Sequence, residues 1–435
     1  MTRWQKLLVF AVIVLGTVLR LHTYDVYPQR GATSDEYTYS FLGQSLLTGG
    51  VPISWSYFGG YKNHRDLTIN KLYFPIVWPY FDHPPLSGIL VAAWAIVNGE
   101  TTFEQISLST IRLVPILFTF ISSVLLFFLL YRQYGFAIAL PALIIYSTST
   151  IMVVSSRVVM AENLLTPLLL GALVYYERVR KKISLRSAII LGIISSLAVW
   201  TKELGIVVAM SVVALFIYDK QKLFHSIVVV AIVAAAILGY VVYGFAYDKE
   251  VFLTIVATQA SRMVGPETLL MLASRPVLIN KVFYDGWYLF GLVGVFACFV
   301  DWKKHFRMLL PFFIYFVLLV GSLTREGDMG WYMIVAYPFL AAASAIVLGD
   351  WWKKPNAMIL VAVLIIGLSF FYYLIELPFG STLARFRLFL GVSFIPYISA
   401  SMLHRERAVV GIQRVTMGTL LFLTALQTYF YIHPA

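Results

Sequence analysis

Apolar runs separated by short polar segments recur along the whole chain. Each run is long enough, alone or with its flanking residues, to form a helix across a hydrocarbon core of roughly 30 Å. The pattern predicts an all-α polytopic membrane protein, with residues 1–435 forming a single transmembrane domain of about 13 spanning helices. Their approximate ranges are 4–21, 112–131, 136–154, 160–176, 187–201, 204–218, 224–246, 287–300, 308–323, 332–350, 357–377, 388–403 and 409–432.

One apolar run, Leu86–Val97, is too short to span. It lies between Pro84-Pro85 and Asn98-Gly99, and about twelve residues cannot cross the core, so we expect a juxtamembrane or re-entrant helix. The first run, 4–21, has basic residues ahead of it but no small-residue cleavage pattern after it. We therefore interpret it as an uncleaved membrane helix rather than a secretory signal.

The distribution of charge supports this topology. With the N-terminus inside and Leu86–Val97 not crossing, the inner segments carry 18 of the 33 lysines and arginines but only five acidic residues. Lysine and arginine concentrate in the short cytoplasmic loops of membrane proteins. The longest outer segments are then 22–111 and 247–286, the C-terminus is outside, and the expected location is the cell membrane.

Composition narrows the class of protein further. The chain is 60% hydrophobic and 12% charged, which a soluble domain cannot bury, and its net charge of +12 is accounted for by the inner loops. A nucleic-acid-binding role is thereby excluded. The single cysteine, Cys298, rules out a disulfide within the chain and a cysteine-rich zinc site.

The remaining ionisable residues lie at outer loops and at the outer mouths of helices. Such groups are costly at membrane depth, so each is a candidate for function. Asp35 and Glu36 form a carboxylate pair just outside the first helix, and Arg157 and Lys202 flank later helices. A sugar donor linked to lipid phosphate needs cations to stabilise its leaving group, and its acceptor needs a base. A base opposite the leaving group favours inversion at the sugar carbon, by analogy with inverting glycosidases.

Four motifs, in this order, resemble the GT-C membrane glycosyltransferases, particularly the branch of the protein O-mannosyltransferases and the lipid A aminoarabinose transferases. They are Asp35-Glu36, His83-Pro-Pro-Leu86, Arg157 to Glu162, and Thr201-Lys202; a Gly330-Trp-Tyr332 motif follows later. The resemblance implies Asp35 as catalytic base, with Glu36 its neighbour. It also implies donor-phosphate contacts from His83, Arg157 and Lys202.

The resemblance implies a polyprenyl-phosphate-sugar donor and a lipid, glycan or protein acceptor, alongside the surrounding membrane lipids. Further candidates for substrate binding are Lys62, His64, Arg65, Asp82, Glu162, Arg325, Trp331 and Tyr332. No organic cofactor is implied. A divalent metal stays open, because the histidines and carboxylates of the first loop are ligand types whose spacing matches no standard site.

The chain also departs from these families. Gly88 replaces a lysine common in protein mannosyltransferases, Glu162 stands where an aspartate is usual, and 247–286 is too short for the large outer domain of the eukaryotic enzymes. Protein acceptors and mannose are therefore not assigned.

Simpler interpretations stay open for these residues and for the whole chain. Asp35-Glu36 could cap a loop helix, Arg157 and Lys202 could snorkel to lipid headgroups, and Arg325 could pair within its loop. The rival functions are a transporter or flippase of lipid-linked substrates and a non-catalytic partner subunit with the same fold. The crowding of polar residues on one side favours an enzyme over a transporter, which usually shows repeat symmetry.

Overall fold

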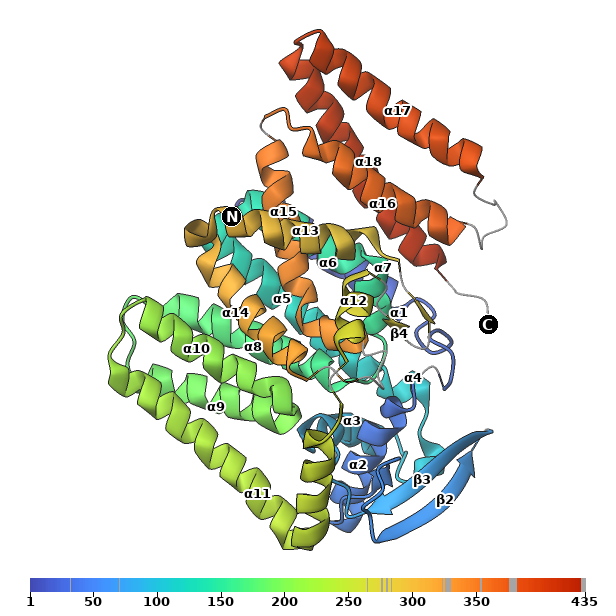
Figure 1. The fold of residues 1–435 in the computed structure, drawn as a ribbon, viewed down its shortest axis with the longest axis vertical. Helices are drawn as coiled ribbons and strands as arrows, with labels where there is room; N and C mark the ends of the chain where they lie inside the picture. Colours follow the sequence, from blue (N-terminus) through green and yellow to red (C-terminus); the bar gives the residue numbers. More distant parts are fainter. Residues whose placement is uncertain are drawn as a thin grey trace.

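The computed structural model describes residues 1–431 except 32, 70, 264, 275–276, 279–280, 283, 323, 325–329, 353 and 375–381. Within this part of the chain the protein is mostly helical. Figure 1 shows an elongated molecule: a helical hairpin projects at one end, and a small sheet with two short helices lies at the other. The hairpin consists of α17 (Leu383–Met402) and α18 (Glu406–Phe430).

The helices expected from the apolar runs are present, most of them with ends within a few residues of the expected ones. They are α1 (Arg3–Leu21), α5 (Leu113–Tyr134), α6 (Phe136–Thr148), α7 (Thr150–Ser155), α8 (Ala161–Val179), α9 (Leu185–Thr201), α10 (Ile206–Tyr218), α11 (Leu223–Ala260), α13 (Gly286–Val300), α14 (Trp302–Val320), α15 (Tyr337–Trp351) and α16 (Met358–Leu374), together with α17 and α18. In the centre, α5 packs against α6 and α8, and α13 packs against α15.

Two expected helices differ from the prediction for identifiable reasons. The run 136–154 divides at Ser149, whose extended backbone separates α6 from α7. The buried Asp285 carboxylate accepts hydrogen bonds from the Ser149 hydroxyl at 2.9 Å and the Ile151 amide at 3.1 Å, and it caps α13 through the Trp287 amide at 2.8 Å. The second of these helices, α11, was expected to end at residue 246. It instead continues to Ala260 after a kink at Asp248.

The segment that is predicted to form the first outer loop contains more than the juxtamembrane helices that were expected. Its helices are α2 (Asp35–Gly49), α3 (Leu86–Val97) and α4 (Leu108–Ile111), with a 3₁₀ turn at Phe103–Gln105. Between α2 and α3 lies an antiparallel sheet in the order β1-β3-β2, formed by β1 (Ser54–Trp55), β2 (Asn63–Ile69) and β3 (Leu72–Trp78).

The all-α expectation is therefore wrong for this loop. The β3 sequence is rich in β-branched and aromatic residues, which favour strands, but it is too short to register as an apolar run. In the β-hairpin of β2 and β3, Arg65 lies opposite Ile76 in the strand register. The segment that is predicted to lie outside after α11 adds α12 (Pro266–Ser274) and a two-stranded ladder of β4 (Val277–Leu278) and β5 (Lys281–Val282).

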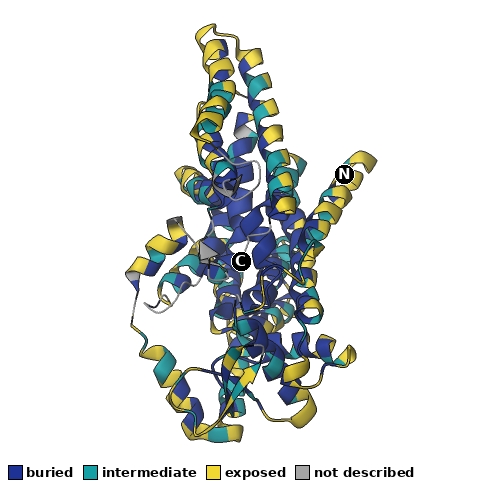
Figure 2. Ribbon diagram, turned by 90° about the vertical axis from the view of Figure 1, so that its right-hand side faces the viewer, coloured by how far each residue is buried: buried dark blue, intermediate teal, exposed yellow. Residues whose placement is uncertain are grey.

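The surface of the molecule is that of an integral membrane protein. Among the described residues, five helical segments are long and apolar enough to cross a membrane: α1, Leu108–Tyr134, α11, α17 and α18. Other apolar helices are shorter, so the count of about 13 spans stays a prediction. Figure 2 shows buried residues gathered in the centre and exposed ones along the outer helices. Large apolar side chains such as Trp4, Phe10 and Val242 are exposed there, as expected for surfaces solvated by lipid.

Candidate active site

Two glycines bring the helices of the first outer loop into backbone contact. A Cβ atom at Gly43 of α2 would lie 2.0 Å from the Gly88 carbonyl oxygen of α3, and one at Gly88 would lie 2.5 Å from the Tyr39 carbonyl oxygen. Only glycine fits at such a close approach. The contact fixes α2, which begins at Asp35, against α3, which begins three residues after His83. It also gives a reason why a lysine could not occupy position 88 here.

Asp35 is a partly exposed carboxylate at the first residue of α2. Among the described residues, its side-chain oxygens accept no hydrogen bond. Protein atoms nonetheless surround the group, and this burial raises the pKa of Asp35 to about 6. Lys202 opposes the shift, and Glu162 and Glu36 add to it. A carboxylate with such a pKa is ionised at neutral pH and is a better proton acceptor than an ordinary aspartate.

Glu36, the next residue, has a different environment. Its side chain is fully buried and forms a two-pronged ion pair with Arg112, with both N–O distances 2.8 Å. Its Oε1 also accepts a hydrogen bond from the Val159 amide at 3.2 Å. Arg112 donates in addition to the carbonyls of Tyr24 and Pro28, at 2.9 and 2.6 Å. Glu36 therefore joins α2 to the start of α5 and has little capacity left for a substrate.

Asp82 and His83 lie beside Asp35 on the segment that leads into α3. Burial raises the pKa of Asp82 to about 7. Hydrogen bonds from Ser56 and Tyr61 to this carboxylate act in the opposite direction, and the Tyr61 hydroxyl donates to it at 2.5 Å. The His83 ring stacks on Tyr39 at 5.3 Å, and its buried Nδ1 has no partner among the described residues. Burial, with the positive charges of Lys202 and Arg262, lowers the pKa of His83 to about 3. His83 is therefore neutral at physiological pH and offers a hydrogen bond rather than a charge.

Lys202 and Glu162 contribute a buried ion pair to the same cluster. Lys202 follows the last residue of α9, and its ammonium group pairs with Glu162 in the first turn of α8. The ammonium also lies 4.0 Å from the centre of the Tyr332 ring. The second oxygen of Glu162 is buried without a partner among the described residues. Lys202 thus reaches into the protein, which is not the geometry of a side chain that snorkels to lipid headgroups.

Arg157 is buried and contacts the backbone. Its guanidinium donates to the carbonyls of Leu19, at 2.7 Å, and Tyr27, at 3.3 Å. These bonds tie the end of α1 to the segment before α8. The described contacts do not join Arg157 to Asp35 or Lys202, so its role at a donor phosphate stays a prediction.

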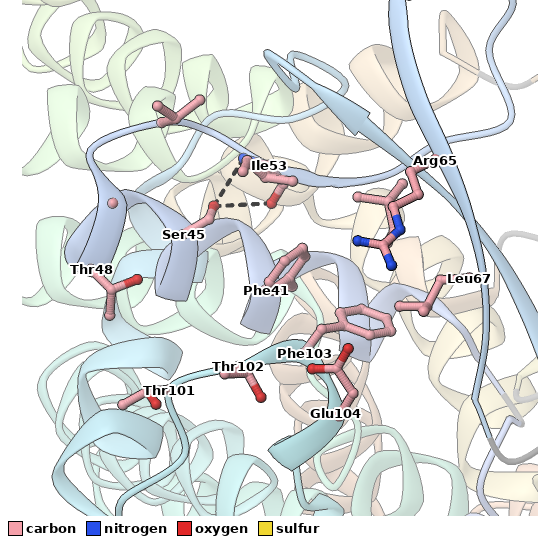
Figure 3. Close-up of a pocket in the computed structure, with 13 residues that line it drawn as sticks. Phe41, Ser45, Thr48, Ile53, Arg65, Leu67, Thr101, Thr102, Phe103 and Glu104 are labelled. Atoms are coloured by element: carbon pink, nitrogen blue, oxygen red, sulfur yellow. Dashed lines mark hydrogen bonds between the residues drawn. The ribbon is translucent and has the colours of Figure 1, made fainter.

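The predicted substrate residues of the sheet lie apart from the cluster. Lys62 is exposed and pairs with Glu250 at 2.6 Å, and His64 is exposed on β2. Arg65 borders a cavity of about 390 Å³ between α2, the sheet and the Phe103–Gln105 turn (Figure 3). Phe41 lines this cavity from a different face of α2 than the one Asp35 occupies, so the cavity is not the space in front of Asp35.

Of the later candidates, Tyr332 joins the cluster and Trp331 is its half-buried neighbour. Arg325 lies outside the described residues. Within the described chain, no three histidine, cysteine, aspartate or glutamate side chains converge as they would around a metal ion. A bound divalent metal therefore stays untested.

Several members of the cluster were not singled out from the sequence. Tyr39 stacks on His83, and Arg262, between α11 and α12, helps to lower the pKa of His83. Tyr61 donates a hydrogen bond to Asp82, and Glu203 helps to raise the pKa of Asp82. Tyr39 had a detectable signal, because it lies one helical turn after Asp35 and so shares its face. Arg262 had none, since more than two hundred residues separate it from Asp35.

Comparison with known proteins agrees with this picture. Residues 82–243 match the family model described as dolichyl-phosphate-mannose-protein mannosyltransferase. No curated protein matches by sequence. The crystal structure of ArnT from Cupriavidus metallidurans bound to undecaprenyl phosphate is similar over 98% of this chain and 77% of that one, with a TM-score of 0.58 and 15% identity.

A second structure, the archaeal oligosaccharyltransferase AglB from Archaeoglobus fulgidus in complex with an inhibitory peptide and a dolichol-phosphate, is similar over 100% of this chain and 56% of that one. Its TM-score is 0.51 and its identity 12%. The shared fold and the family match over residues 82–243 support the resemblance to the GT-C membrane glycosyltransferases that was drawn from the sequence.

Proposed function

We propose that the protein transfers a sugar from a polyprenyl-phosphate-linked donor to an acceptor at the outer face of the cell membrane, with inversion at the sugar carbon. The observation that carries this proposal is the contrast between two adjacent carboxylates. Asp35 is partly exposed, unbonded within the described chain and titrates near neutral pH, whereas Glu36 is occupied by Arg112. The first is suited to accept a proton, and the second holds the helix that presents it.

In this mechanism the acceptor hydroxyl donates its proton to the Asp35 carboxylate while its oxygen attacks the anomeric carbon. The bond from that carbon to the phosphate oxygen breaks, and polyprenyl phosphate leaves with the bonding electrons. Lys202 stabilises the negative charge of the leaving phosphate, and neutral His83 donates a hydrogen bond to it. The Glu162 partner holds the Lys202 ammonium in place.

The named ligands of the similar structures support the donor class. ArnT is described with undecaprenyl phosphate and AglB with a dolichol-phosphate, and both share the fold. The acceptor is a lipid, glycan or protein bearing a nucleophile that an aspartate can deprotonate. The inner-loop cations support an orientation with α2, α3 and the sheet outside.

The decisive experiment measures sugar transfer from a polyprenyl-phosphate donor, and donor binding separately, in liposomes. Asp35→Asn keeps the shape of the side chain but removes its proton acceptor, so transfer should fall roughly 10²–10⁴-fold while donor binding persists. Asp66→Asn is the matched control, because Asp66 is an exposed carboxylate of the same loop bonded to Tyr73 at 2.8 Å. Wild-type transfer by Asp35→Asn would remove Asp35 from the mechanism. Loss of donor binding would assign it a structural role.

A further inference from the structure

A polar hollow lies at the opposite end of the helical bundle from the Asp35 cluster. Helices α5, α8 and α10 end there, and α14 begins there. The hollow has a volume of about 110 Å³. Its lining is formed by Arg132, Gln133, Tyr134, Glu177, Arg180, Tyr218, Lys303, Lys304, Phe306 and Arg307.

The separation from the proposed active site follows from the helices themselves. Glu162, in the first turn of α8, belongs to the Asp35 cluster, and Glu177, in the last turn, lines the hollow. Fifteen residues of helix at 1.5 Å each put these two carboxylates about 22 Å apart. In the same way α5 starts beside Arg112, the partner of Glu36, and ends at the hollow with Arg132 and Tyr134.

Five cations but only one carboxylate line this hollow. Glu177 is already engaged: its oxygens accept from Arg180 at 2.7 Å and from Gln133 at 3.1 Å. The nearby Asp219 is engaged as well, by Arg307 and by the Tyr176 hydroxyl, both at 2.5 Å. Both acidic side chains therefore hold side chains in or beside the lining of the hollow in place, and neither is free to neutralise the remaining cations.

Three of the cations that line the hollow have no acidic partner within the described residues. Arg132, Lys303 and Lys304 are exposed, and none of them pairs with a carboxylate within the described residues. The rule that cations favour the inner surface explains that they are present on this side. That rule does not explain why these three cations lie around one hollow. The stacked rings of Tyr218 and Phe306, whose centres are 3.9 Å apart, also line this hollow.

We propose that this hollow is a binding site for a phosphate group, separate from the donor site. Arginine forks and lysine ammonium groups are the side chains that bind phosphate oxygens best. The volume is well below that of sites for drug-sized ligands, so the hollow takes a headgroup and not a whole lipid. The phosphate belongs either to an anionic phospholipid of the facing leaflet or to a free phosphate, and the two sources share the same contacts.

The test uses the purified full chain in a neutral detergent and a fluorescent short-chain phosphatidylglycerol as the probe, with phosphatidylcholine as the neutral lipid. The site variant is Lys303→Gln with Lys304→Gln, and the matched control is Lys181→Gln with Lys182→Gln. Lys181 and Lys182 are two adjacent exposed lysines between α8 and α9 that do not line the hollow. Arg132→Gln serves as a second, single-site variant, because this side chain is exposed and its replacement should leave the fold intact.

Wild-type protein should bind the anionic lipid and not the neutral one. Both site variants should weaken that binding, the double variant roughly tenfold or more, and the control less than twofold. If inorganic phosphate binds with the same dependence on Lys303 and Lys304 while the lipid does not, the source is free phosphate. Equal weakening by site variant and control, or no weakening by either site variant, would overturn the proposal.

Discussion

At the scale of single residues, the pH dependence of transfer should identify the base. Burial raises the pKa of Asp35 to about 6, and a general base must be ionised. The transfer rate at low substrate should therefore fall about tenfold per pH unit below pH 6 and level off above it. His83 cannot produce this limb, because burial lowers its pKa to about 3.

Asp82 is the control for that profile, since burial raises its pKa to about 7 and it lies in the same cluster. Asp82→Asn removes one neighbouring negative charge, so the acid limb should persist and move slightly towards lower pH. Disappearance of the limb in Asp82→Asn, with Asp35 unchanged, would make Asp82 the base instead.

The buried pair of Glu36 and Arg112 should matter for stability more than for chemistry. Arg112→Met leaves the buried Glu36 charge without its partner, so the free energy of unfolding should fall by about 3–5 kcal/mol. Lys62→Met removes an exposed, solvent-screened pair and should leave the free energy of unfolding nearly unchanged. Denaturant unfolding in detergent compares the two. Equal, small losses would show that the buried pair contributes no more than a surface contact.

At the scale of elements, the contact between α2 and α3 positions the proposed base. A methyl group at Gly88 would meet the Tyr39 backbone, so Gly88→Ala should push α2 away, cost about 1–3 kcal/mol and lower transfer. Gly411→Ala is the matched control, because no atom lies within 4 Å of the added methyl. It should leave transfer unchanged and stability equal or slightly higher. Normal transfer by Gly88→Ala would mean that this close contact does not set the position of Asp35.

At the scale of the whole molecule, the topology predicts which surfaces a membrane-impermeant thiol reagent reaches. In a Cys298→Ala background, single cysteines at the exposed positions Ser184 and Ser261 should label from opposite sides of the membrane. Ser184 lies between α8 and α9, and Ser261 follows α11. Native Cys298 is buried and would label poorly even if retained. Labelling of both positions from one side would contradict the predicted topology.

The apolar runs alone predict an integral membrane protein, because a spanning helix must satisfy its backbone internally and expose an apolar surface of sufficient length. Leu86–Val97 is bounded by Pro84-Pro85 and Asn98-Gly99, which are local signals, so the predicted run and α3 have the same ends. The sequence also singled out Asp35 and Lys202, since charged residues near apolar runs are rare enough to stand out, and the GT-C resemblance added His83 and Glu162.

The contacts that these residues make with one another could not be predicted from the sequence. The two adjacent carboxylates look alike in sequence, and Arg112, 76 residues from Glu36, distinguishes them by pairing with one alone. Likewise nothing local predicts that Lys202 meets Glu162 rather than a lipid headgroup, or that Lys62 and His64 stay outside the cluster. Burial and charge pairing depend on segments that are distant in the chain, and the packing of α2, α3, α8 and α9 brings them together.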